Sequence, residues 1–116
     1  MRDIDSFDEI YLYRQPVDMR KYRNGLCQIV RADLGMSVFS PTLFVFCNRV
    51  KTIIRFLYWD DTGFAVWSKT LDKQRYKWPS RRFEGEGLNL TTEHLRNLLT
   101  GMDVTLHKKL EYEDVF

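Results

Sequence analysis

Positions 43–79 constrain the fold of this chain most strongly, because they read as consecutive β-strands joined by short polar turns. Runs of aliphatic and aromatic residues predict the strands, and polar residues such as Asp60-Asp61-Thr62-Gly63 predict the turns. Short connections favour antiparallel neighbours, so this stretch predicts a β-meander. The predicted strands are Leu43–Cys47, Thr52–Trp59, Phe64–Leu71 and Arg75–Trp78.

The same part of the chain is strongly basic. Between Arg49 and Arg82, nine Lys or Arg residues stand against three acidic residues, which gives +6, whereas the whole chain carries only +2. The ends of the chain are acidic: residues 1–10 carry −3 and residues 83–116 carry −4. A basic sheet of this kind requires either an anionic partner or many cations that face water. Nucleic acid is the obvious anionic partner.

Two helices complete the predicted elements. After a first strand at Glu9–Arg14, a long helix is predicted over Met19–Leu34, with Asp18 placed to cap its first turn and Gly35 to end it. A shorter helix is predicted over Glu93–Thr100, with Thr91 or Thr92 as its cap. The expected fold class is therefore α+β: a single small domain in which an antiparallel β-meander packs against one long N-terminal helix, with a short C-terminal helix.

The length of 116 residues corresponds to about one domain. We expect an acidic N-terminal segment at residues 1–9, a folded domain at residues 10–103 and an acidic C-terminal tail at residues 104–116. The sequence leaves the conformation of the tail open. No apolar run approaches the roughly 20 residues that span a bilayer, and the acidic start lacks the apolar core of a secretory leader. The expected location is the cytoplasm, without contact to a membrane.

The sequence offers no pattern typical of an enzyme or of a metal site. Cys27 and Cys47 are expected to be reduced and buried, and neither His94 nor His107 has a second ligand at metal-binding spacing. Asp60-Asp61 is the one local acidic pair that could attract a metal ion, but the following Thr-Gly favours a hairpin turn. A phosphate-binding loop of the G-x-x-x-x-G-K type is missing from the sequence. We therefore expect a protein without catalytic residues, metal or other cofactor.

Cations on a sheet face or a hairpin tip can neutralise DNA phosphates and release counterions. The predicted DNA-binding residues are Arg20, Lys21, Arg23, Arg49, Lys51, Arg55, Lys73, Arg75, Lys77, Arg81 and Arg82. The alternative is that the cations bind no partner: they are solvated and protect the edges of the sheet from aggregation. The strand aromatics could stack on unpaired bases, although such residues more often fill the core or form cross-strand pairs. They are Phe56, Tyr58, Trp59, Phe64, Trp67, Tyr76 and Trp78.

Several motifs of this chain, in this order, resemble one known family. They are Pro16-Val17-Asp18-Met19-Arg20-Lys21, Gly25-Leu26, Leu43-Phe44-Val45-Phe46-Cys47-Asn48-Arg49, Leu57-Tyr58-Trp59-Asp60, Gly63-Phe64, Trp67, Lys69 and Trp78-Pro79. The chain is similar, from about Ile10 to Asp103, to TnpB of the insertion sequence sixty-six group, which is also called its second open reading frame. This family is distinct from the RNA-guided nuclease that shares the name TnpB.

The resemblance implies a small bacterial protein that is encoded beside a separate DDE-type transposase and assists transposition. Its implied partners are DNA, as duplex and at the ends of the element, and the cognate transposase. Two functions stay open at this point: non-catalytic DNA binding through the basic sheet, or an adaptor that docks on the transposase without contacting DNA. Whether the chain forms a homo-oligomer is also open.

Overall fold

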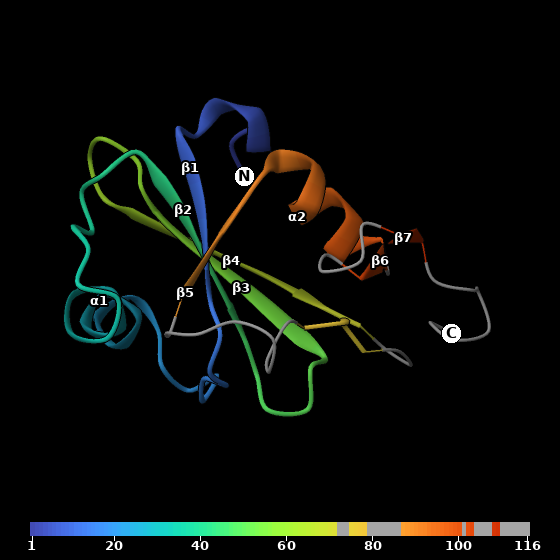
Figure 1. Ribbon diagram of the computed structural model, residues 1–116. Helices are drawn as coiled ribbons and strands as arrows, with labels where there is room; N and C mark the ends of the chain where they lie inside the picture. The colour runs from blue at the N-terminus through green and yellow to red at the C-terminus, as the bar shows by residue number, and fades with distance from the viewer. Residues whose placement is uncertain (72–74, 79–86, 101, 104–107, 110–116) are drawn as a thin grey trace.

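The computed structural model describes residues 1–71, 75–78, 87–100, 102–103 and 108–109. A short 3-10 helix, Ile4–Ser6, precedes a five-stranded sheet and two α-helices (Figure 1). In chain order the elements of this unit are β1 (Glu9–Tyr13), α1 (Arg23–Ala32), β2 (Thr42–Cys47), β3 (Ile53–Trp59), β4 (Phe64–Thr70), β5 (Gly87–Leu90) and α2 (Thr92–Leu99). Two further strands of two residues, β6 (Met102–Asp103) and β7 (Lys108–Lys109), pair with each other in antiparallel fashion.

The sheet is mixed, with the strand order β4-β3-β2-β1-β5. β1 lies parallel to β2, and all other neighbours are antiparallel. The chain leaves one end of β1, returns through α1 and enters β2 at the opposite end, which is the connection that a parallel pair requires. β4 and β5 are therefore the two edge strands of this sheet.

The architecture predicted from the sequence is wrong. The antiparallel meander includes only β2, β3 and β4, whereas β1 joins it in parallel and carries β5 on its outer side. The N-terminal helix is not long, because α1 covers Arg23–Ala32 instead of the predicted Met19–Leu34. Residues 75–78, predicted as a strand, belong to no helix or strand.

The late start of α1 is explained by a tertiary contact with β3. One guanidinium nitrogen of Arg55 donates to the backbone carbonyls of Met19 and Lys21. A helix that began at Met19 would need these carbonyls as acceptors for its own N–H groups four residues later. Lys21 also lies against Gly25, where an added Cβ would stand 2.9 Å from the Cβ of the lysine. The segment before α1 is therefore attached to the sheet and cannot continue the helix.

Each face of the sheet supports its own hydrophobic core. α1 covers one face and α2 the other (Figure 1). The α1 side buries Leu26, Cys27, Ile29 and Val30 of the helix against sheet residues that include Tyr13, Phe44, Phe46 and Leu57. The α2 side buries Leu95 and Leu98 with Ile10, Leu12, Leu43, Val45, Cys47, Ile54, Phe56, Tyr58, Tyr76, Trp78 and Leu90. All six residues of β2 are buried, as its unbroken apolar run predicts for a central strand.

Several local predictions are confirmed. Gly35 follows α1 in the left-handed region, with φ 63°, and the next N–H, that of Met36, donates to the carbonyl of Val30. Thr91 caps α2 by accepting from the backbone N–H of His94, at 3.0 Å. The N–H of Asp60 donates to the carbonyl of Gly63 at 2.8 Å, which closes the predicted turn.

Within the described part of the chain, no helix is long and apolar enough to cross a membrane.

Candidate nucleic-acid interface

Three basic segments that are distant in sequence meet at one end of the sheet, where β2 ends and β3 begins. The N–H of Val17, in the segment that follows β1, donates to the carbonyl of Cys47 at the end of β2, at 2.9 Å. The N–H of Tyr76 donates to the carbonyl of Lys51, in the β2–β3 turn, at 2.8 Å. In Figure 1 the segment after β1 and the β2–β3 turn both lie at the lower end of the sheet.

We call this region the basic end and define it by Arg20, Lys21, Arg49, Lys51, Arg75 and Lys77. Four of these side chains are exposed, and those of Lys51 and Lys77 are half-buried. The structure therefore brings six of the eleven predicted DNA-binding residues to one place. Lys73, Arg81 and Arg82 lie outside the described residues. Arg23 and Arg55 are described but lie beside the basic end, on the α1 face of the sheet, where Arg55 donates to the carbonyl of Lys21.

The β2–β3 turn is held in a defined shape by Asn48. The amide oxygen of Asn48 accepts from the backbone N–H groups of Thr52 at 2.9 Å and Ile53 at 3.0 Å. Lys51 adopts the left-handed region, with φ 64°. A hollow of about 410 Å³ lies between this turn and the segment before α1, and Asp18 and Arg49 are among its lining residues. The turn thus presents two cations on a rigid support.

One acidic residue lies among these cations. The carboxylate of Asp18 is 2.6 Å from the guanidinium of Arg20, and both side chains are exposed to solvent. The hydrogen bond from Arg20 lowers the pKa of Asp18 from its ordinary 3.8 to about 2. Asp18 therefore stays ionised at neutral pH and neutralises part of the charge of Arg20. We expect Arg20 to contribute less to binding an anion than Arg49, which has no acidic partner among the described residues.

Arg55 has an internal role that the sequence did not predict. Its Nε donates to Ser68 on β4 at 2.7 Å, and Nη1 donates to the carbonyls of Met19 and Lys21 at 2.8 and 2.9 Å. The guanidinium also lies 5.3 Å from the centre of the Tyr22 ring. These contacts join β3, β4 and the segment before α1. Arg55 therefore organises the surface around it, because Nε and Nη1 are both hydrogen-bonded within the chain.

The opposite end of the sheet is acidic. The segment before β1 and the β3–β4 turn are both at that end, and the N–H of Asp8 donates to the carbonyl of Pro41 there, at 3.0 Å. An ion pair of 2.8 Å links Asp5 to Arg96 of α2. The acidic side chains at this end are those of Asp3, Asp5, Asp8, Glu9, Asp60 and Asp61. Positive side chains therefore gather at one end of the sheet and negative side chains at the other.

The predicted stacking aromatics are divided between core and surface. Phe56, Tyr58, Tyr76 and Trp78 are buried, which removes them as stacking platforms. Trp67, by contrast, is 50% exposed on the edge strand β4. Two exposed rings that the sequence did not single out are Tyr22 and Phe39, each 59% exposed. Their exposure could not be read from the sequence, because both lie in segments whose path depends on tertiary contacts.

The described residues bring together no metal-holding group of side chains, and the two thiols of the chain are buried. In that part of the chain, no group of three or more His, Cys, Asp or Glu side chains lies close enough together to hold a metal ion. Cys27 and Cys47 are free thiols and are buried. Burial raises the pKa of Cys47 from 9.0 to about 12, so this thiol is protonated at neutral pH and is a poor nucleophile.

Comparison with known proteins identifies a family and two similar proteins. A family described as "IS66 Orf2 like protein" matches residues 8–109. An uncharacterized protein, y4jC, of Sinorhizobium fredii (strain NBRC 101917 / NGR234) is 29% identical over 86% of this chain and 84% of its own length. A second uncharacterized protein of the same strain, y4hO, is 31% identical over 74% of this chain and 73% of its own length. No solved structure matches the chain significantly. Because the family match covers nearly the whole sequence, this chain belongs to the IS66 Orf2-like family.

Proposed function

We propose that this chain is a non-catalytic accessory protein of insertion-sequence transposition that binds duplex DNA through its basic end. Membership of the IS66 Orf2-like family indicates the accessory role and an association with the IS66 transposition machinery. The proposal adds a mechanism to that role: the protein contacts the phosphate backbone, while the chemistry of strand transfer belongs to another protein.

One observation carries the proposal. Segments around residues 20, 50 and 76, which are far apart in sequence, place six cations at one end of the sheet, and the acidic groups gather at the other end. Such a separation orients the molecule towards a polyanion, because Asp18 is the one carboxylate among the described residues that lies with the six cations, and it offsets the charge of Arg20 alone. A solvated sheet with cations only for solubility would have no need to gather them on one side.

Fluorescence anisotropy with a labelled duplex, across a salt series, tests the proposal. Each phosphate contact releases a counterion, so a surface using all six cations would give a slope of log K against log salt of about −5. A binding curve that does not change with salt, or no binding at low salt, would contradict the proposal.

A matched pair of variants locates the surface. Arg49→Glu reverses a charge in the β2–β3 turn, and Arg96→Glu makes the same change on α2, near the acidic end. We expect the first variant to weaken duplex binding roughly tenfold and the second to leave it nearly unchanged. Equal losses in both variants would show that only net charge matters.

The adaptor is the second candidate function, and the acidic end favours it. This end would repel DNA but can contact a basic surface of a partner protein, such as a transposase. Association with the purified cognate transposase, in nuclease-treated samples, would support an adaptor role. Retention of that association in Arg49→Glu, together with its loss in Asp3→Lys/Asp8→Lys, would assign the two ends of the sheet to two partners.

A further inference from the structure

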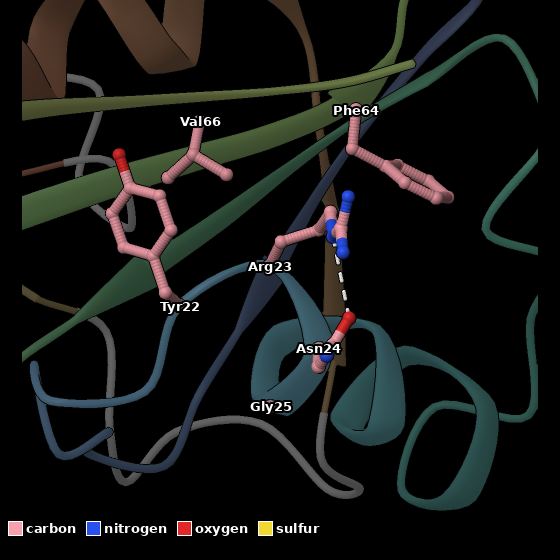
Figure 2. Close-up of a pocket in the computed structure, with 6 residues that line it drawn as sticks. All are labelled: Tyr22, Arg23, Asn24, Gly25, Phe64 and Val66. Carbon is pink, nitrogen blue, oxygen red and sulfur yellow. Dashed lines mark hydrogen bonds between the residues drawn. The ribbon is translucent and has the colours of Figure 1, made fainter.

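A groove lies between α1 and the edge strand β4 with its preceding turn, on the α1 face of the sheet. Two cavities form it, of about 480 and 490 Å³, and Arg23, Asn24 and Phe64 line both of them. Figure 2 shows the residues that line the first. Each volume falls within the roughly 300–1,000 Å³ that is typical of ligand sites. None of the six residues of the basic end lines the groove. The groove therefore uses other residues than the surface proposed for duplex DNA, and it adjoins that surface at Lys21, which lies against the lining residue Gly25.

The polar lining of the groove is cationic. Arg23, in the first turn of α1, and Arg31, in the last, are both exposed and face the same space. Among the described residues, no acidic side chain lines either cavity, although Asp61 precedes the lining residue Thr62 in the adjoining turn. Asn24 and Gln28 contribute amides, which can both donate and accept hydrogen bonds. The groove is suited to a ligand with negative charge and polar edges.

The apolar lining includes Val66 and Cys27 and three aromatic rings that the core leaves wholly or partly uncovered. Tyr22 borders one cavity and is 59% exposed. Trp59 and Phe64 border the other, with ring centroids 5.0 Å apart. Phe39, also 59% exposed, packs on both of these rings at 5.1 and 5.6 Å. Exposed rings beside arginines are the combination with which proteins bind unpaired bases, because each base offers a flat face to stack and a phosphate to pair.

We infer that this groove binds unpaired nucleotides of DNA, with bases stacked on Tyr22, Trp59 or Phe64 and flanking phosphates held by Arg23 and Arg31. The inference rests on the proposed DNA-binding function but uses other residues. A duplex cannot occupy the site in this way, because its base faces are stacked on one another and its edges are paired. An acidic peptide would satisfy the arginines and the amides but would leave the ring faces without the flat bases that stack on them.

Anisotropy of a labelled 12-nucleotide thymidine strand, at fixed low salt, tests this inference. Phe64→Leu keeps an apolar side chain against the core and removes the ring, while Arg31→Gln removes a cation from an exposed helix position. Each should weaken binding of the single strand about tenfold, since one base–aromatic stack or phosphate contact is lost. Neither change should weaken duplex binding more than twofold.

Matched controls come from the opposite face of β4. Trp67→Phe changes an exposed aromatic residue there, and Lys69→Gln removes the same charge as Arg31→Gln. On β3, Phe56 is the cross-strand partner of Trp67 and Ile54 is the partner of Lys69. Both partners pack in the core on the α2 side of the sheet. The two controls should bind the single strand as the unmodified chain does. A loss in the controls equal to that in the groove variants would overturn the inference.

Tryptophan fluorescence gives an independent readout. Stacked bases should quench Trp59, so quenching by the thymidine strand should disappear in Trp59→Phe and persist in Trp67→Phe. Persistence of the quenching in Trp59→Phe would overturn the placement of bases in the groove.

The remaining outcomes separate this inference from the proposed function. Duplex binding by a chain that does not bind the single strand would overturn the groove inference and leave the proposed function standing. Binding of neither nucleic acid would overturn both. Binding of a labelled polyglutamate peptide with loss in Arg31→Gln, but no binding of the single strand, would assign the groove to a protein partner and overturn the inference.

Discussion

The guanidinium of Arg55 and the backbone of Met19 are joined by a hydrogen bond of 2.8 Å, although the two residues are 36 positions apart in the chain. A second bond from the same nitrogen reaches Lys21, so β3 fixes the segment that leads into α1. This attachment holds the segment that carries Arg20 and Lys21 directly before the start of α1. A residue expected to contact DNA thus shapes the surface on which other candidate contacts stand.

Arg55→Ala should lower the free energy of unfolding by about 2 kcal/mol, because the carbonyls of Met19 and Lys21, the first of them in a part-buried hydrogen bond, lose a charged donor. Urea denaturation followed by circular dichroism measures the change. Lys69→Ala, on the exposed part of the neighbouring strand β4, is the control and should change stability by less than about 0.5 kcal/mol. Full stability of Arg55→Ala with a loss of duplex affinity would instead make Arg55 a direct phosphate ligand.

Reversal of Arg75 and Lys77 to Glu should weaken duplex binding at least tenfold and reduce the salt slope by about 2, one for each lost phosphate contact. The fold should persist, because Tyr76 between them is buried and its N–H is bonded to Lys51. Anisotropy and thermal denaturation measure the two effects. Unchanged affinity in a folded double variant would remove this segment from the DNA-binding surface.

The sequence predicts the charge of the basic end better than its geometry. Lys and Arg are visible wherever they occur, so the charges of Arg49, Arg75 and their neighbours follow from the amino-acid sequence alone. Their convergence depends on long-range backbone hydrogen bonds, such as that from Val17 to Cys47, which no local pattern encodes. The groove beside α1 also depends on tertiary contacts and could not be predicted from the sequence. The helical pattern assigns Arg31 only to the solvent face of a helix.

The fold shows the same division between local and long-range information. The apolar run of β2 and the turn at Asp60–Gly63 are predicted correctly, because strand and turn residues act over a few positions. The parallel pairing of β1 with β2 is not predicted from the sequence, because it depends on where the crossover through α1 returns the chain to the sheet. The excess length of the predicted helix reflects an apolar stripe that continues past the point where Arg55 interrupts the backbone hydrogen bonds.

The pair of Asp18 and Arg20 should respond to pH in a defined direction. The pKa of Asp18 is depressed from 3.8 to about 2 in the folded chain, so any stability that the pair contributes is present above pH 3.8 and is lost as the pH falls towards 2. Arg20→Ala should return this pKa towards 3.8, as measured by carboxyl NMR titration. A value near 3.8 in the unmodified chain would show that the pair does not persist in solution.

Asp18→Asn tests the same pair at neutral pH. It frees Arg20 and removes a negative charge from the basic end, so duplex affinity should rise about twofold to fivefold at low salt. The control is Asp33→Asn, a change of equal charge at the C-terminal end of α1, where Asp33 accepts from the hydroxyl of Tyr13. An equal gain in the control would attribute the effect to net charge alone.

Two buried groups should make the fold sensitive to alkali. Burial raises the pKa of Cys47 from 9.0 to about 12 and that of Tyr76 from 10.0 to about 12. The unfolded chain releases these protons first, so the stability that depends on the neutral groups is complete below pH 9 and decreases as the pH rises towards 12. Cys47→Ala should flatten this decrease, as measured by urea midpoints between about pH 8 and pH 11. Parallel curves for the two proteins would exclude Cys47 as a source of the effect.

Gly87→Ala should destabilise the fold by about 1–3 kcal/mol, the usual cost of overpacking. Gly87 opens β5 opposite Tyr13, and a Cβ at this position would overlap the ring of Tyr11 and stand 2.9 Å from a methyl group of Leu34. Both neighbours are held between the sheet and α1, so they cannot both move away without disturbing that core. Gly63→Ala is the control, because an added Cβ there meets no atom within 4 Å. Equal stability of the two variants, in thermal denaturation, would show that β5 does not pack on β1 in this register.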